Sequence, residues 1–351
     1  MTDRSSNADS TDRPLVKLGF LTIGFFDEHD PLGGHESTLQ IIELGEQLGF
    51  DSAWLRDRHL QFGISSPVAV LAAATQRTSR IELGTAVIPL GFENPFRLAE
   101  DLATVDVLSR GRLNPGISVG TPTHFEAVRD HLYPDSWQNE NFGHERVERL
   151  LANLRGEAVS TFTGTEGIEA YSPRIQPFAA GLAERVWYGA AGLSSAAWAG
   201  EHGLNLLSSS VVRAEEDDDF ARIQRAQIDL FRSKHPLGEA ARASQGLVVI
   251  PTDSASPEQI AKYRAYAAGR FDRTLTPQGP GRILFAPDIV GSSAEIADAL
   301  QAHAGYQAVD EVVFALPFSF EHEDYVQILT DIATRLAPLL GWAPASSGTG
   351  A

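Results

Sequence analysis

Residues 81–119, IELGTAVIPL GFENPFRLAE DLATVDVLSR GRLNPGISV, carry the pattern that decides the fold. Residues 81–88 form an apolar run that is typical of a buried strand. Asn94 and Pro95 then supply an N-cap and a first-turn proline, which predict the start of a helix. A second apolar run follows over residues 112–119. The segment therefore predicts a strand, a helix and another strand in succession.

The same alternation extends in both directions from this segment. Apolar runs that predict strands precede stretches in which apolar residues have helical spacing. The strands and the helices that follow them are expected at 16–21 and 37–48, 52–55 and 68–75, 112–119 and 145–154, 186–190 and 194–201, 204–208 and 215–232, 246–250 with 257–269 and 293–302, and 311–315 and 325–339. About eight strand–helix units are the count of a TIM (β/α)8 barrel.

An open, doubly wound α/β sheet would also use strand–helix repeats. The chain has no G-x-G-x-x-G loop after its first predicted strand and no G-x-x-x-x-G-K-[ST] loop, which are the phosphate loops of such sheets. We therefore expect one TIM-barrel domain over residues 15–342, flanked by loose polar tails at 1–14 and 343–351. Insertion loops at the C-terminal face are expected at 120–143, 156–184 and 253–291.

The composition narrows the classes of function. The 351 residues include 28 Lys plus Arg against 46 Asp plus Glu, a net charge of −18, and no cysteine. An acidic surface disfavours binding to nucleic acid or to anionic membranes. The absence of cysteine excludes disulfides and thiolate metal sites and allows a reducing compartment. With no apolar run near the roughly 20 residues of a membrane helix, we expect a cytoplasmic protein.

Candidate site residues follow the predicted strands, because barrel chemistry lies at the carboxyl ends of the strands. His59, after the second strand, is a candidate acid/base group, since an imidazole titrates near neutrality; a surface pair with Asp57 is the alternative. After the fifth strand, Gly192, Ser194 and Ser195 open a helix whose free N–H groups could hold a phosphate. An ordinary serine-capped helix would explain the same residues.

Two other motifs indicate different chemistry. Ser118 lies in GISVG, which fits the G-x-S-x-G nucleophile elbow, and Asp288 and His322 follow in the hydrolase order. An elbow needs a helix directly after the serine, whereas residues 121–123 read TPT, so a serine hydrolase is disfavoured. The acidic run 27–30 could suggest a metal site, but neighbouring side chains cannot all face one ion without a shaped loop. We expect no metal there.

Taken in order along the chain, five segments resemble the bacterial luciferase-like flavin-dependent monooxygenases. The matching segments are WLRDRH at 54–59 with W-x-x-[ED]-H-H, LGTAV at 83–87 with L-G-T-A-[AV], 95–112 with P-x-x-x-A-E-D-x-x-x-x-D-x-x-S-x-G-R, GISVG at 116–120 with G-[IV]-x-x-G, and 192–203 with S-x-x-x-x-x-W-A-x-x-x-G. Each motif alone is weak, and their shared order and strand–helix placement make the resemblance specific.

The resemblance implies that reduced FMN binds at the barrel mouth and activates O2 to oxygenate a small organic substrate. The flavin ring would lie beside Thr85, Ala86 and Val87, with a cis peptide bond between Ala86 and Val87. His59 and Ser118 would be the catalytic residues near the ring. An NAD(P)H-dependent flavin reductase is the implied partner, and a homodimer is the implied assembly.

The implied phosphate site departs from the family in one respect. The phosphate-binding residues would be Ala191, Gly192, Ser194 and Ser195. Some relatives carry an arginine that contacts phosphate where this chain has Val119, and the first of the family's paired histidines is Arg58 here. Modest phosphate affinity would suit a two-component enzyme. The alternatives are an F420-dependent oxidoreductase on the same barrel and a non-catalytic flavin-binding barrel.

Overall fold

The computed structural model describes residues 14–344, so the predicted tails lie almost entirely outside the described residues. Ten strands form one sheet, and every neighbouring pair in it is parallel. In chain order the strands are β1 Lys17–Thr22, β2 Ser52–Leu55, β3 Glu82–Thr85, β4 Ile88–Pro89, β5 Leu113–Asn114, β6 Gly116–Ser118, β9 Trp187–Ala190, β10 Asn205–Ser208, β12 Ala243–Gln245 and β16 Glu311–Ala315. The sheet order is β4-β6-β9-β10-β12-β16-β1-β2-β3-β5.

Two of the predicted strands are interrupted, and each of the two halves pairs on a different side. Ala86 and Val87 separate β3 from β4, and the bond between them is cis, as the resemblance implied. Pro115 separates β5 from β6. The sheet order starts with β4 beside β6 and ends with β3 beside β5. Since β3 continues into β4 and β5 into β6 along the chain, the same two chain segments form both ends of the sheet order.

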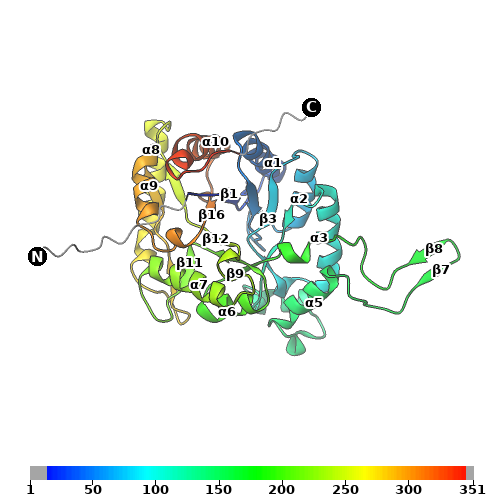
Figure 1. Cartoon of the computed structure of the whole chain (residues 1–351). Coiled ribbons are helices and arrows are strands. Elements are labelled where there is room, and N and C mark those ends of the chain that lie inside the picture. The colour runs from blue at the N-terminus through cyan, green and yellow to red at the C-terminus, as the bar shows by residue number, and fades with distance from the viewer. Residues whose placement is uncertain (1–13, 345–351) are drawn as a thin grey trace, which may run out of the picture.

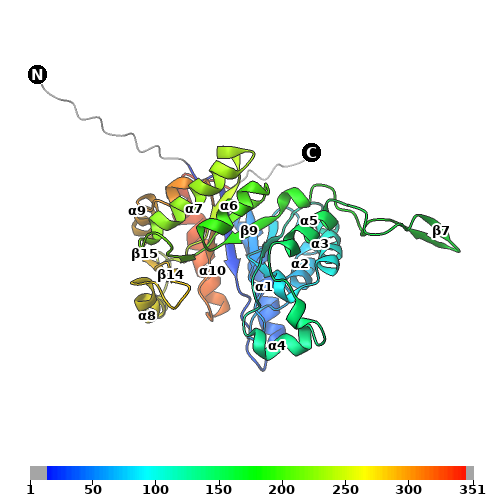
Figure 2. The ribbon, with the colours of Figure 1, turned by 90° about the horizontal axis from the view of Figure 1, so that it is seen from below.

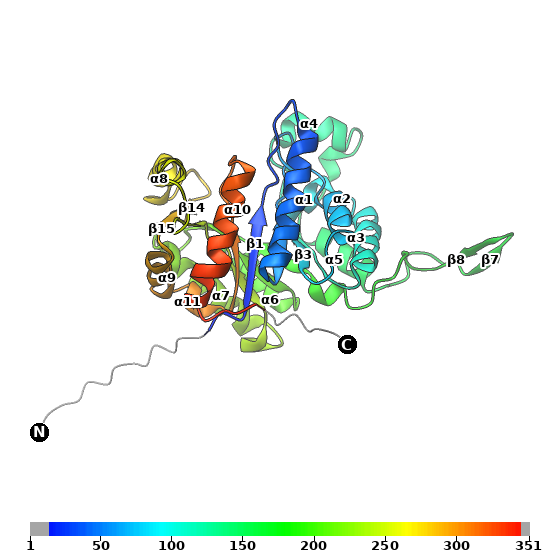
Figure 3. The same cartoon turned by 90° about the horizontal axis from the view of Figure 1, so that it is seen from above.

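Helices cover the outer face of the curled sheet (Figure 1). The helices of the described chain are α1 Pro31–Leu48, α2 Pro67–Thr75, α3 Pro95–Ser109, α4 Phe125–Leu132, α5 Glu145–Leu154, α6 Leu193–Glu201, α7 Phe220–Lys234, α8 Pro257–Arg270, α9 Ser293–Gln301, α10 His322–Asp331 and α11 Ala337–Leu339, with a π turn at Ile332–Leu336. Helix α4 belongs to an insertion and buries no residue of its own. Viewed from above, α1 and α10 lie in contact on either side of β1 (Figure 3). None of the described helices is long and apolar enough to cross a membrane.

Local caps set where the helices begin. Asn94 Oδ1 accepts a hydrogen bond from Phe96 N at 2.9 Å, which confirms the predicted start of α3. Helix α1 begins at Pro31, earlier than predicted, because Asp30 caps it through Gly33 N at 2.9 Å. Helix α7 begins later than predicted, at Phe220, since Asp219 supplies its cap. A single polar side chain thus shifts a helix start by several residues.

The insertions contain structure that the sequence did not predict. The strand expected at 246–250 was wrong in its bounds, because β12 ends at Gln245 and the chain then leaves the main sheet. Outside that sheet lie three short strand pairs, namely β7 Gly164–Glu166 with β8 Glu169–Tyr171, β11 Val211–Arg213 with β14 Ile283–Phe285, and β13 Val249–Pro251 with β15 Ile289–Gly291. The β7–β8 hairpin stands away from the body of the molecule (Figure 2).

Short 3-10 turns complete the fold at Leu90–Phe92, Trp137–Asn139, Ala183–Arg185, Gly238–Ala240, Phe271–Thr274 and Tyr306–Ala308. Inside the curl of the sheet, Trp54 and Trp187 pack edge to face, with ring centroids 5.5 Å apart. Both are fully buried and form a cluster with Leu207 and Val313. A side chain at Gly84 would collide with Trp54, whose Cε3 lies 2.2 Å from the Cβ position. The interior is therefore filled at this level, which leaves the strand ends for binding.

Candidate active site

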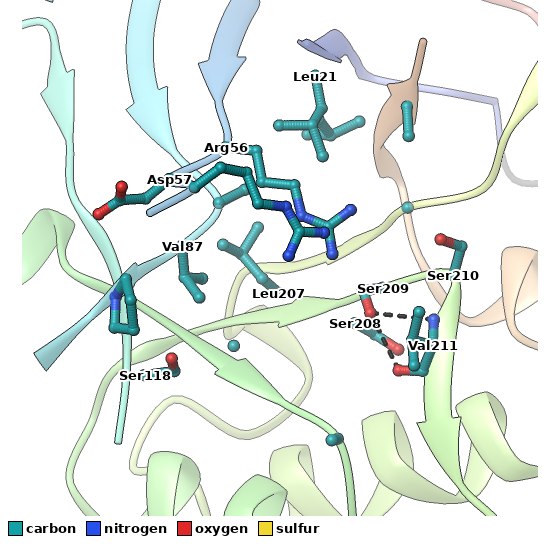
Figure 4. Close-up of a pocket in the computed structure, with 18 of the residues that line it drawn as sticks. Leu21, Arg56, Asp57, Val87, Ser118, Leu207, Ser208, Ser209, Ser210 and Val211 are labelled. Carbon is teal, nitrogen blue, oxygen red and sulfur yellow. Dashed lines mark hydrogen bonds between the residues drawn. The ribbon is translucent and has the colours of Figure 1, made fainter. Parts of the chain in front are cut away.

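A cavity of about 440 Å³ lies at the carboxyl ends of the main strands. Residues at or near the end of each strand segment line it, namely Leu21, Arg56, Val87, Ser118, Ala190, Ser208, Ser244 and Ala315. Figure 4 shows several of these side chains directed inward from different strands. This is the place where parallel barrels build their active sites.

Asp57, which is buried, and His59, which is half-buried, form a pair in the cavity wall. His59 Nε2 lies 3.5 Å from Asp57 Oδ1, and the imidazole stacks on Phe92 with ring centroids 3.8 Å apart. Neither Asp57 oxygen nor His59 Nε2 has a hydrogen-bond partner in the described residues. His59 therefore lines the cavity, as expected of an acid/base group, and also lies beside Asp57, as the alternative of a pair with Asp57 predicted.

Burial shifts the proton affinities of this pair. Desolvation, with a smaller repulsion from Glu93, raises the pKa of Asp57 to about 7. Desolvation also lowers the pKa of His59 below its usual value. Each shift disfavours the charged form of its group in the cavity wall. A carboxyl that titrates near neutrality beside a largely neutral imidazole can hold or pass a proton at physiological pH.

The predicted ring site is only partly assembled around the cavity. Ala86, Val87 and Ser118 line it together with His59. Thr85 does not line it, because this side chain is fully buried and its Oγ1 donates to Gly116 O at 2.8 Å while accepting from Gly116 N at 2.9 Å. Thr85 thus ties β3 to β6.

The hydrolase alternative is wrong. No helix follows Ser118, since the next one, α4, begins only at Phe125. Asp288 forms an ion pair with Arg270 at 2.6 Å. His322 Nδ1 lies 2.8 Å from the Ser37 hydroxyl instead. Asp288 and His322 therefore have partners other than Ser118. Residues 14–344 also contain no group of three or more metal-ligating side chains that could hold an ion.

The predicted phosphate site at the N-terminus of α6 holds a carboxylate of the protein itself. Leu193 N donates to Glu215 Oε2 at 2.7 Å. The Ser195 hydroxyl accepts from Gly192 N at 3.2 Å and donates to Gly192 O at 2.8 Å. Of the four residues predicted to hold phosphate, Ala191 lines the cavity, whereas Gly192, Ser194 and Ser195 are outside its lining. A carboxylate is stabilised at a helix N-terminus as a phosphate would be.

Sequence reasoning missed several groups in the cavity wall. The hydroxyls of Ser208 and Ser244 are buried without a hydrogen-bond partner in the described residues. Arg56 and Phe318 also line the cavity. One signal was available, because Arg56 is a charged residue directly after the buried strand β2. The sequence around Ser244 contained no such signal, because the residues that surround this serine in the cavity come from other segments of the chain.

A sequence model of a protein family, described as luciferase-like monooxygenase, matches residues 16–324. The chain is 41% identical over 128 residues to limonene 1,2-monooxygenase of Rhodococcus erythropolis, a match covering 36% of this chain and 32% of the relative. It is 33% identical over 128 residues to the F420-dependent glucose-6-phosphate dehydrogenase of Amycolatopsis mediterranei, covering 35% and 36%. The matches thus span about a third of these curated relatives.

A solved structure shares the fold over nearly the whole chain. It is the oxygenating constituent of 3,6-diketocamphane monooxygenase from the CAM plasmid of Pseudomonas putida, in complex with FMN. The TM-score is 0.66 at 14% identity, covering 92% of this chain and 98% of the other. At this identity the likeness concerns the fold alone.

Proposed function

Because the chain belongs to the luciferase-like monooxygenase family, and is therefore an oxidoreductase, we propose that it uses reduced FMN and O2 to oxygenate a small organic substrate. The observation that carries this proposal is the cavity itself. It brings His59, Val87, Ser118 and Ala191 together from four segments far apart in the sequence. His59, Val87 and Ser118 lie in segments that resemble the family, and Ala191 directly precedes another.

The cavity suits the ring of a flavin better than its phosphate. Val87, Leu207 and Val313 offer an apolar surface, and the unpartnered hydroxyls of Ser208 and Ser244 offer hydrogen bonds to polar ring atoms. At the phosphate end, the carboxylate of Glu215 would have to give way or be neutralised. This arrangement supports weak, exchangeable binding of FMN, as in an enzyme that receives reduced flavin from a separate NAD(P)H-dependent reductase.

Bound FMN would supply the reducing equivalents and the activation of O2. The protein's own part is to exclude water and to manage one proton. The apolar walls limit access of water to the reacting atoms. The stack on Phe92 fixes the plane of the His59 ring, and Asp57 at 3.5 Å can share a proton with its Nε2. We assign the acid/base role to His59 and a hydrogen-bonding role to Ser118.

Several finer features belong to the same proposal. Counting β3 with β4 and β5 with β6 as two interrupted strands makes eight, which supports a (β/α)8 barrel formed by a single domain over residues 15–342. We further propose a homodimer in the cytoplasm.

An F420-dependent oxidoreductase is the second candidate, because one relative is named as an F420-dependent dehydrogenase. Anaerobic titration with FMN, riboflavin and F420, followed by substrate turnover with and without O2, separates the two. We expect binding of FMN with micromolar affinity and oxygenation that requires O2. Binding of F420 with hydride transfer in the absence of O2 would contradict the FMN proposal.

A further inference from the structure

A guanidinium without a protein partner projects into the cavity. Arg56 lines the cavity, and Figure 4 shows its guanidinium pointing inward while the Asp57 carboxylate points the other way. Within residues 14–344, Arg56 has a ring contact with Phe318, at 5.6 Å from the ring centroid, but its guanidinium makes no hydrogen bond or ion pair. The charge is therefore presented to whatever occupies the cavity.

Two other arginines with little exposed side chain are paired with carboxylates. Arg146 forms an ion pair with Glu140 at 2.6 Å, and Arg185 forms one with Asp106 at 2.7 Å. Burying a cation without a counter-charge is costly, so unpaired ones are rare unless a ligand completes them. Arg56 differs from these two arginines, and it lines the cavity, where a ligand could supply the missing anion.

The surroundings of Arg56 are positive although the chain as a whole carries a net charge of −18. Arg58 also lines the cavity. Arg270 lies over the same Phe318 ring at 5.1 Å, but Asp288 already neutralises it. Burial, with repulsion from these two neighbours, lowers the pKa of Arg56 to about 10, so it stays charged at neutral pH. A cationic region inside an acidic protein concentrates anions in that cavity.

We propose that the substrate is an organic anion whose oxyanion group, a carboxylate, sulfonate or phosphate monoester, binds Arg56 with help from Arg58. The planar fork of a guanidinium matches such groups in two parallel hydrogen bonds. The carbon skeleton would lie against Val87 and Leu207, toward the expected flavin ring. This inference rests on the proposed function and names the substrate class for the same cavity.

The position of Arg56 favours a substrate anion over the flavin phosphate. Arg56 follows β2, whereas the stretch resembling the family's phosphate site follows β9. Around the curled sheet, β2 and β9 are separated by β10, β12, β16 and β1 on one side and by the interrupted strands β3–β4 and β5–β6 on the other. The acid group of a substrate and the phosphate of FMN would therefore approach different sides of the mouth.

Calorimetric titration of matched ligands tests the inference. Hexane-1-sulfonate, hexanoate and neutral hexan-1-ol would each be titrated into the protein with and without FMN. We expect both anions to bind more tightly than the alcohol. Arg56→Gln should weaken anion binding by about 10- to 100-fold, the range for a hydrogen bond to a charged group, and leave the alcohol unchanged. Arg56→Lys should retain part of the affinity.

Arg149→Gln is the matched control, because Arg149 is exposed on α5 and its removal changes the net charge equally. It should bind all three ligands as the wild type does. Equal binding of anions and alcohol, or equal losses in the Gln variants at 56 and 149, would overturn the inference. So would a loss in Arg56→Gln confined to FMN and absent for riboflavin, since the guanidinium would then hold the flavin phosphate.

The outcome also separates this inference from the proposed function. If the wild type fails to bind FMN but still prefers the anions through Arg56, the flavin proposal fails and the anion site stands. If FMN binds and the anions show no preference, the anion site fails and the flavin proposal stands.

Discussion

Replacing Asp57 by Asn should stabilise the protein, and the gain should grow with pH. Asp57 is 7% exposed, and both of its oxygens lack hydrogen-bond partners in the described residues. Arg58 lowers the pKa of Asp57 only in part, and burial holds the pKa of His59, at 3.5 Å from Asp57, below its usual value. An amide of the same shape removes the buried negative charge without leaving a cavity.

The sign follows from the direction of the pKa shift. Burial raises the pKa of Asp57 from 3.8 to about 7, so between these values the folded state holds a proton that the unfolded state has released. The wild type therefore loses stability as pH rises through this window, and the loss is complete above about pH 7. At about 1.4 kcal/mol per pKa unit, the cost reaches about 4 kcal/mol at most. The asparagine side chain of the variant cannot ionise and escapes this cost.

Urea unfolding at several pH values between 5 and 8.5 measures the effect. We expect the free energy of unfolding of Asp57→Asn to exceed that of the wild type, by a margin that widens by about 2–3 kcal/mol across the range. Asp298→Asn, at an exposed position on α9, is the control and should show no such trend. Parallel pH profiles for Asp57→Asn and the wild type, or a margin that narrows as pH rises, would refute the reasoning.

Three further results are expected. Glu215→Gln should tighten FMN binding by about 5- to 10-fold, since like charges near a partly exposed surface repel by about 1–2 kcal/mol. Ser195→Glu should weaken FMN binding. Neither variant should change the binding of riboflavin, which lacks the phosphate. His59→Ala should lower the rate of oxygenation by about 10²–10⁴-fold and release more hydrogen peroxide per flavin consumed, with FMN affinity nearly unchanged. If the variant gives the same yields of product and peroxide as the wild type, His59 has no part in the proton step. Ser118 should not react with a fluorophosphonate, and stoichiometric labelling seen by mass spectrometry would contradict the site.

Much of the fold could be predicted because its signals are local. The apolar run at 81–88 and the cap at Asn94 determine the structure of the residues next to them, so the alternation of strand and helix can be predicted from the sequence alone. The same holds for the segment order that resembles the family. Helix starts were less predictable, since Asp30 and Asp219 compete with neighbouring residues for the role of cap.

The sequence by itself determined the repeat of strands and helices and the positions from which side chains reach the mouth. Tertiary structure alone decided which of those side chains have partners. Glu215 reaches the N-terminus of α6 from 22 residues beyond Leu193. Asp57 acquires its raised pKa from burial, and the guanidinium of Arg56 forms no hydrogen bond or ion pair within residues 14–344. Burial and long-range pairing depend on segments brought together only by folding, and the periodicity of the chain carries no record of them.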